Sequence, residues 1–128
     1  MRHSHGMQQW AGKTALVTGT SSGIGAAIAS RLLADGMRVV GCGRRPERVA
    51  EVLTAADPSG ESSLALGCDV TDEAAVKGMF AAAKDRFGGV DVLVNNAGLG
   101  HAGTLADGTV EHWREMLEVN LLGLCLCT

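Results

Sequence analysis

The chain alternates four short apolar runs with longer segments of helical periodicity, and this alternation constrains its fold more than any other feature. The apolar runs cover residues 13–18, 38–42, 63–68 and 90–95. The first two helical patterns cover 23–36 and 46–56. The third has Thr71 as its N-cap and extends to about Phe87, and the last begins near Thr109. Because the runs are almost continuously apolar, they predict strands of a parallel sheet covered on both faces. We therefore expect an α/β fold with a doubly wound, Rossmann-type parallel sheet in three α/β/α layers. The chain would contain only the first four strands of this sheet.

Composition and charge limit what such a domain can bind. The 128 residues are 46% hydrophobic and carry a net charge of −3, which supports a buried core and argues against an electrostatic nucleic-acid binder. No apolar run approaches the roughly 20 residues that a membrane span needs. The N-terminus has no apolar signal region. We expect a flexible tail at 1–12 and an incomplete dinucleotide-binding domain at 13–128.

The cysteines indicate the redox compartment. Cys42, Cys68, Cys125 and Cys127 show no C-x-x-C spacing. Such a set is typical of small buried thiols in a reducing environment, and not of a disulfide framework. We expect a cytoplasmic protein.

A glycine-rich turn, VTGTSSGIG, joins the first predicted strand to the first predicted helix. A dinucleotide pyrophosphate needs a tight turn, close backbone approach and unpaired helix amides. Gly19 suits the turn, Gly23 the close approach, and Gly25 the packing of the helix against the strand. Glycines also serve ordinary turns, but the strand–turn–helix context favours nucleotide binding. The predicted cofactor-binding residues here are Gly19, Thr20, Ser21, Ser22, Gly23, Ile24 and Gly25, with the Thr20, Ser21 and Ser22 hydroxyls and backbone amides as donors.

The end of the second predicted strand selects between the two nicotinamide dinucleotides. An acidic residue there would bind the free ribose 2′-hydroxyl of NAD. The sequence instead has Arg44 and Arg45, whose guanidinium groups suit a 2′-phosphate. The alternative is two surface arginines, but cations at a helix N-terminus are unfavourable unless an anion compensates them. The arginines therefore favour NADP(H) over NAD(H).

Polar residues also follow the third and fourth predicted strands. Asp69 is placed to accept from an adenine amino group, and Val70 follows it. Asn95 and Asn96 are placed to tie neighbouring strand ends together or to meet the ribose. Ordinary strand-end turns would explain either segment alone, yet all four strand ends share one edge of the sheet. The predicted cofactor-binding residues at these two ends are Asp69, Val70, Asn96, Ala97 and Gly98.

These segments together resemble the short-chain dehydrogenase/reductase family. The TGxxxGxG turn, the Asp69 strand end, the NNAG segment at 95–98 and an asparagine at Asn120 occur in the family's order and span essentially the whole chain. The resemblance implies hydride transfer between nicotinamide and an alcohol or carbonyl substrate, with steroids and isoprenoids as possible classes. It also implies a homo-oligomer.

The family's catalytic tetrad is Asn, Ser, Tyr and Lys, and the resemblance carries over only its asparagine, onto Asn120. The chain contains no tyrosine, so the family's YxxxK pair is absent from these 128 residues. The helix that carries Asn120 reaches Thr128 without a C-cap glycine, a basic last turn or a proline. We expect a chain cut within its fold, poorly soluble or partly molten by itself, and inactive.

Three hypotheses of function remain at this point. The first is the NADP(H)-binding N-terminal part of a short-chain alcohol/carbonyl oxidoreductase. The second is a non-catalytic nucleotide-binding or interaction module that is complete as written. The third is an extended-type relative such as a sugar epimerase, whose glycine turn would more usually follow G-x-x-G-x-x-G.

Overall fold

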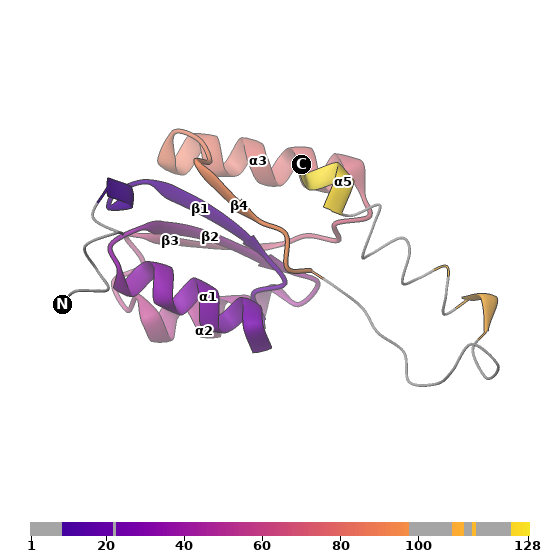
Figure 1. Cartoon of the computed structure of the whole chain (residues 1–128), viewed down its shortest axis with the longest axis horizontal. Coiled ribbons are helices and arrows are strands. Elements are labelled where there is room, and N and C mark those ends of the chain that lie inside the picture. Colours follow the sequence, from indigo (N-terminus) through magenta and orange to yellow (C-terminus); the bar gives the residue numbers. More distant parts are fainter. Residues whose placement is uncertain (1–8, 22, 98–108, 112–113, 115–123) are drawn as a thin grey trace.

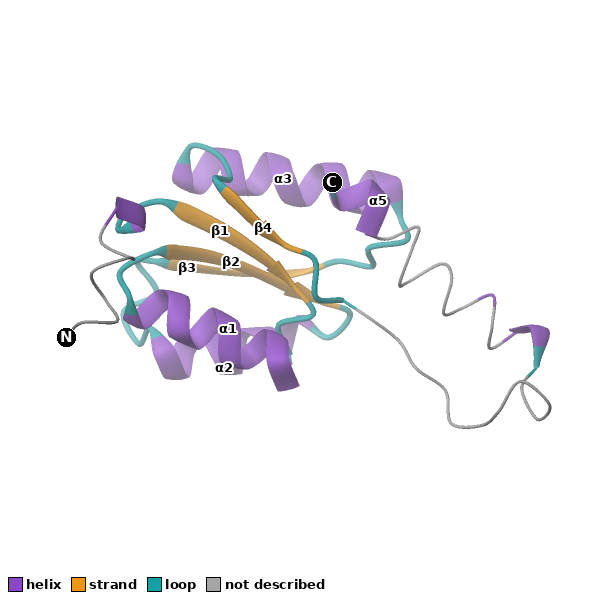
Figure 2. Cartoon of the chain, viewed as in Figure 1, coloured by secondary structure: helices purple, strands orange, loops and turns teal. Residues whose placement is uncertain are grey.

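A computed structural model describes residues 9–21, 23–97, 109–111, 114 and 124–128. Its strands are β1 (Thr14–Thr18), β2 (Arg38–Gly43), β3 (Ser63–Gly67) and β4 (Val92–Val94), and its helices are α1 (Gly23–Ala34), α2 (Pro46–Ala56), α3 (Glu73–Phe87) and α5 (Leu124–Cys127). The strands form one parallel sheet in the order β3-β2-β1-β4. In Figures 1 and 2, α1 and α2 cover one face of the sheet, and α3 and α5 cover the other. The predicted three-layer, Rossmann-type fold is confirmed.

Alternation along the strands divides the core between the two faces of the sheet. Val17 and Val39 pack with residues of α1 and α2, whereas Leu16, Val40 and Cys42 pack with residues of α3 and α5. All five side chains are fully buried. Each such burial contributes about 1.5–3 kcal/mol for a large aliphatic side chain, so the two inner strands stabilise both layers.

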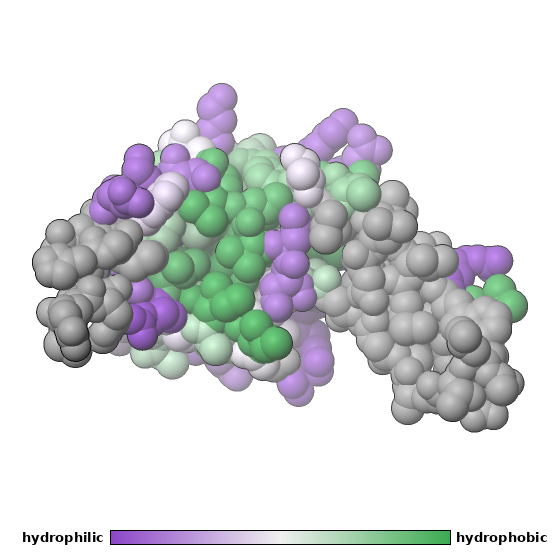
Figure 3. All heavy atoms as spheres, viewed as in Figure 1, coloured by the Kyte–Doolittle hydropathy of each residue, from purple (hydrophilic) through white to green (hydrophobic). Residues whose placement is uncertain are grey.

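Burial falls from the centre of the sheet to its edges. Every residue of β1 is buried, and β2 is buried from Val39 to Cys42. The edge strands differ, since β4 is only half-buried along its length and so is β3 up to Leu66. Figure 3 shows apolar side chains gathered on the face where β4 lies between α1 and α3.

The first turn of α3 corrects one prediction. Asp72, and not Thr71, is the N-cap, because its carboxylate accepts a hydrogen bond from the Ala75 amide at 3.2 Å. The Thr71 hydroxyl instead donates to Asp69 at 2.6 Å. A carboxylate one position later is the better cap since it is charged and faces the positive end of the helix.

Most of the last predicted helix lies outside the described residues. Residues 110, 111 and 114 are helical, and α5 covers Leu124–Cys127. Among the helices that the structure describes, none combines the length and apolar character needed to cross a membrane.

Candidate cofactor site

The carboxyl ends of the four parallel strands lie at one edge of the sheet. β1 lies between β2 and β4. The chain places β2 and then β3 on one side of β1, and it then crosses over to place β4 on the other side. Such a reversal of strand order opens a crevice outside the carboxyl ends, where doubly wound folds bind ligands. The predicted cofactor-binding residues that the structure describes follow the ends of β1, β2, β3 and β4 at this edge.

The Thr18 side chain joins the ends of β1 and β4. Its hydroxyl donates to the Val94 carbonyl at 3.3 Å and accepts from the amides of Asn96 and Ala97, both at 2.9 Å. Thr18 is 1% exposed, so these bonds lie where an unpaired amide is costly. The ends of β1 and β4 are therefore held together by the protein's own contacts.

Gly19 makes the tight turn that follows β1. Its φ of 70° is in the left-handed region, which favours glycine. The Asn96 side-chain amide donates to the Gly19 carbonyl at 3.2 Å. A Cβ on Gly25 would overlap that same carbonyl oxygen, so only glycine lets α1 pack this closely. The turn role expected of Gly19 and the packing role expected of Gly25 both agree with this geometry.

Thr20 corrects another expectation, because its hydroxyl is not available to a ligand. Thr20 is fully buried, and its hydroxyl donates to the Val17 carbonyl at 2.6 Å. Its backbone amide donates to the Cys42 carbonyl at 3.1 Å. The two donors of Thr20 thus bind β1 and β2, and Thr20 supports the turn from beneath. This inward orientation was not predictable from the residue type, since the neighbouring serines have the same chemistry.

The turn faces outward beyond Thr20. Ser21 is half-buried, Gly23 is exposed, and Ile24 is 72% exposed. Gly23 has a φ of 62°, and a Cβ there would meet nothing within 4 Å, so the space before it is open. The first amides of a helix have no partner within the helix and carry partial positive charge. The amides at the start of α1 therefore give a positive helix end, suited to an anion, that borders open space.

Arg44 and Asp69 lie together at the ends of β2 and β3. Their closest charged atoms, Arg44 Nη2 and Asp69 Oδ1, are 3.8 Å apart, with side chains 61% and 45% exposed. Asp69 Oδ1 also accepts from the amide and hydroxyl of Thr71 at 3.0 and 2.6 Å. Hydrogen bonds from Thr71, and secondarily the Arg44 charge, lower the pKa of Asp69 below its usual value of 3.8. Asp69 is therefore ionised at neutral pH, and Arg44 is weakly held.

Arg45 occupies the N-cap position of α2 and makes no side-chain capping bond there. Pro46 follows at the first helical position, so the cationic side chain stands at the positive end of the helix. Val70 differs from its polar neighbours, since its side chain is 7% exposed and belongs to the core on the α3 side. Only the backbone of Val70 is thus placed to meet a ligand.

Three predicted site residues, Ser22, Gly98 and Asn120, lie outside the described residues. Asn96 binds Gly19 as described, and Ala97 is half-buried beside it. The Asn95 side chain donates to the Thr128 hydroxyl at 3.2 Å. Of the two roles expected for the asparagine pair, the link between strand ends is the one that the contacts show.

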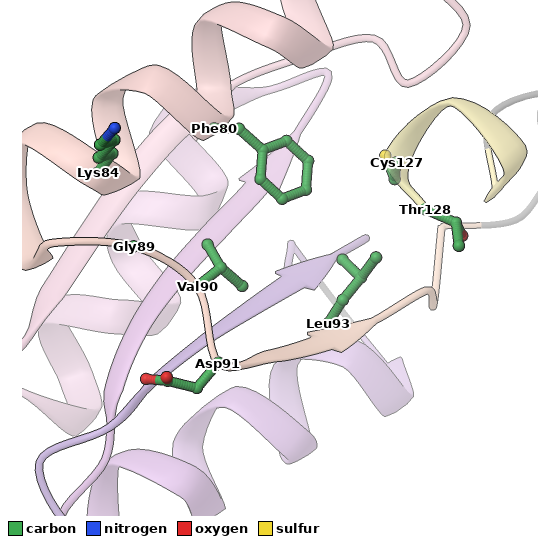
Figure 4. A pocket seen from close by; sticks show the side chains of 8 residues that line it. All are labelled: Phe80, Lys84, Gly89, Val90, Asp91, Leu93, Cys127 and Thr128. Carbon is green, nitrogen blue, oxygen red and sulfur yellow. The ribbon is translucent and has the colours of Figure 1, made fainter.

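A hollow of about 420 Å³ lies against β4, α3 and α5 (Figure 4). Phe80, Val90 and Leu93 provide its apolar lining. The Asp91 carboxylate on its rim accepts from the Thr14 amide at 2.9 Å, which ties β4 to β1. None of the predicted cofactor-binding residues that the structure describes lines this hollow.

Sequence reasoning missed Thr18 as the link between β1 and β4. A signal was present, because a threonine that ends a buried strand must find partners for its hydroxyl. Those partners are more than 70 residues away in the chain, so the sequence alone did not indicate which they are.

Comparison with known proteins identifies the family. The pattern of the family described as short chain dehydrogenase matches residues 13–128. The chain belongs to this family. Its members bind nicotinamide dinucleotides and act on small alcohols and carbonyl compounds, and the resemblance drawn from the sequence motifs is confirmed.

Among similar proteins, the farnesol dehydrogenase of Aedes aegypti is 47% identical over 124 residues, covering 95% of this chain and 51% of the relative. Dehydrogenase/reductase SDR family member 11 of Gallus gallus is 40% identical over 124 residues, covering 95% of this chain and 49% of the relative. The chain thus spans about half the length of the curated relatives it matches.

Solved structures agree with these relatives. A short-chain dehydrogenase/reductase from Brucella melitensis superposes with a TM-score of 0.87 at 28% identity, covering 92% of this chain and 49% of the other. A short-chain type dehydrogenase/reductase from Mycobacterium marinum has a TM-score of 0.86 at 30% identity, with coverage of 92% and 46%.

Proposed function

We propose that the chain is the NADP(H)-binding N-terminal part of a short-chain oxidoreductase that interconverts an alcohol and a ketone or aldehyde. The observation that carries this proposal is the glycine turn. Its inner half is bound to β1, to β2 and to Asn96 beyond β4, while its outer half presents the amides of α1 to open space. This geometry fits a dinucleotide pyrophosphate, which needs close approach and a positive helix end.

The residues at the ends of β2 and β3 support NADP(H) over NAD(H). Arg44 is exposed and, among the residues that the structure describes, is held by one long ion pair to Asp69. A 2′-phosphate would offer Arg44 a charge-assisted, bidentate partner, and Arg45 adds a second cation at the start of α2. We propose that Asp69 and the backbone of Val70 meet the adenine, and that the segment Asn96, Ala97 and Gly98 meets the ribose.

In the reaction, the bound cofactor would exchange a hydride with the substrate carbon. The role of this chain's residues is to bind and orient it. Asn120 is the proposed contribution to catalysis, and the serine, tyrosine and lysine of the family's tetrad would lie outside these 128 residues, which contain no tyrosine. We accordingly expect the 128-residue chain to bind cofactor without turnover.

The substrate class follows the relatives. Farnesol is named for the Aedes aegypti relative and a hydroxysteroid for one of Eggerthella lenta that is 42% identical, so we propose an isoprenoid or steroid alcohol. We also propose a homo-oligomer in the cytoplasm. The free cysteines are in keeping with a reducing compartment.

Equilibrium titration with NADPH and NADH tests this proposal. We expect NADPH to bind at least about tenfold more tightly, because a phosphate hydrogen-bonded to arginine contributes about 1.5–3 kcal/mol. Equal or tighter binding of NADH would reject the NADP(H) preference. Absence of binding by either cofactor would reject the function itself.

A further inference from the structure

Gly41, in the middle of β2, lacks a side chain at a position where one would have no space. A Cβ there would lie 2.9 Å from both Cγ2 and Oγ1 of Thr20 and 3.1 Å from Cδ1 of Leu53. Gly41 is not among the described glycines with positive φ, so its backbone does not require glycine. Its place in β2 therefore depends on space, and the space is filled by Thr20.

Two hydrogen bonds hold Thr20 in this position, so a larger residue at position 41 could move it only by straining them. It is fully buried, and its hydroxyl binds the carbonyl of Val17, which is the cross-strand partner of Gly41. Its amide binds the carbonyl of Cys42, the residue after Gly41. Thr20 thus inserts above the β1–β2 pair at Gly41, where β2 presents only hydrogen.

The peptide that joins Gly19 to Thr20 is consequently held at both ends. Asn96 binds its carbonyl and Cys42 binds its amide. The outward half of the turn begins at the next residue, Ser21. A shift of Thr20 would move this peptide and, with it, the amides at the start of α1.

We propose that Gly41, which lies outside the glycine turn, is a positioning residue for the cofactor site, because its missing side chain admits Thr20 and thereby sets where the turn presents its amides. The inference rests on the proposed function, since it assumes that these amides bind a dinucleotide. It adds to that function a residue on β2 that the glycine motif does not contain.

A double-mutant cycle on the natural gene product that carries this chain tests the proposal. The variants are Gly41→Ala, Thr20→Ala and the two combined, and Gly78→Ala in α3 is the control, because a Cβ on Gly78 would meet nothing within 4 Å. NADPH affinity is measured by titration. We expect Gly41→Ala to weaken binding at least about tenfold and Gly78→Ala to leave it unchanged. In the Thr20→Ala background the added methyl group fits, so the Gly41→Ala effect should fall to less than about twofold.

Persistence of the full Gly41→Ala effect in the Thr20→Ala background would overturn the proposal, because the effect would then come from Leu53 or from the strand itself. If Gly41→Ala alone does not fold, the double variant should fold, and a double variant that is also unfolded would overturn it equally.

Amide hydrogen exchange without cofactor separates this inference from the proposed function. We expect Gly41→Ala to speed exchange of the Thr20 amide, and the double variant to resemble Thr20→Ala alone. If the wild-type protein binds no dinucleotide, the proposed function fails and the exchange rates still decide the role of Gly41. Unchanged exchange at Thr20 in Gly41→Ala would reject it.

Discussion

The two parts of the proposed cofactor site, the turn after β1 and the cationic end of β2, are built in opposite ways. The turn is bound to three strands through Thr18, Thr20 and Asn96, and two of these residues are at most 1% exposed. Arg44, in contrast, is 61% exposed and has one ion pair at 3.8 Å. In the proposed site the pyrophosphate side would therefore be preorganised, whereas the 2′-phosphate side would gain its main partner only when the cofactor binds.

This difference predicts that changes in the turn affect both folding and binding, while changes at the end of β2 affect cofactor choice alone. The largest effect is expected for Gly25→Ala. The added methyl group overlaps the Gly19 carbonyl, so either α1 or the turn must move. We expect a loss of about 3 kcal/mol or more in the free energy of unfolding, measured by urea denaturation. Gly78→Ala is the control, and a stable Gly25→Ala variant with unchanged cofactor affinity would contradict the account.

Thr18→Val should have the next largest effect. The substitution keeps the shape but removes the hydroxyl that accepts from the Asn96 and Ala97 amides, of which the Asn96 amide also donates to the Val94 carbonyl at 3.0 Å. We expect the free energy of unfolding to fall by about 2 kcal/mol or more, and cofactor binding to weaken with it. Thr54→Val on the exposed face of α2 is a matched control. Equal stabilities of the two variants would show that the link between β1 and β4 is dispensable.

Arg44→Ala should leave the protein as stable as before, because exposed ion pairs contribute about 0–1 kcal/mol. It should weaken NADPH binding about tenfold or more and leave NADH binding unchanged. Lys77→Ala, which removes an exposed lysine of α3, controls for the loss of one positive charge. Parallel weakening of both cofactors would place Arg44 outside the 2′-phosphate site.

The smallest effect is expected from Asp69. Thr71 and Arg44 hold its pKa below 3.8, so the ionised form stabilises the folded state. This contribution is fully present above the unfolded pKa, near about 4, and disappears as the pH falls through the lower folded pKa. The stability difference between wild type and Asp69→Asn should thus shrink between about pH 5 and pH 2. A difference that grows on acidification would mean that the pKa is raised instead.

The same contrast separates what the sequence revealed from what it did not. The roles predicted for Gly19, Gly25 and Arg44 follow from residue type and from the order of strand, turn and helix, and these are local features of the chain. The contacts of Thr18, Thr20, Gly41 and Asn96 depend on which strands become neighbours. Asn96 meets Gly19 across 77 residues, and no local pattern encodes that partner. Residue type alone does not distinguish Thr71 from Asp72 as the N-cap of α3, because both adjacent polar side chains are suited to that position.

Amide chemical-shift titration with ADP-ribose and with its 2′-phosphate tests the central claim most directly. The account predicts that both ligands shift the amides of Ser21, Gly23 and Ile24, that the Thr20 amide shifts far less because it is bound to Cys42, and that only the 2′-phosphate perturbs Arg44. Shifts concentrated elsewhere, or as strong at Thr20 as at Gly23, would contradict the account. They would mean that the part of the turn bound to the strands is not separate from the part that meets the cofactor.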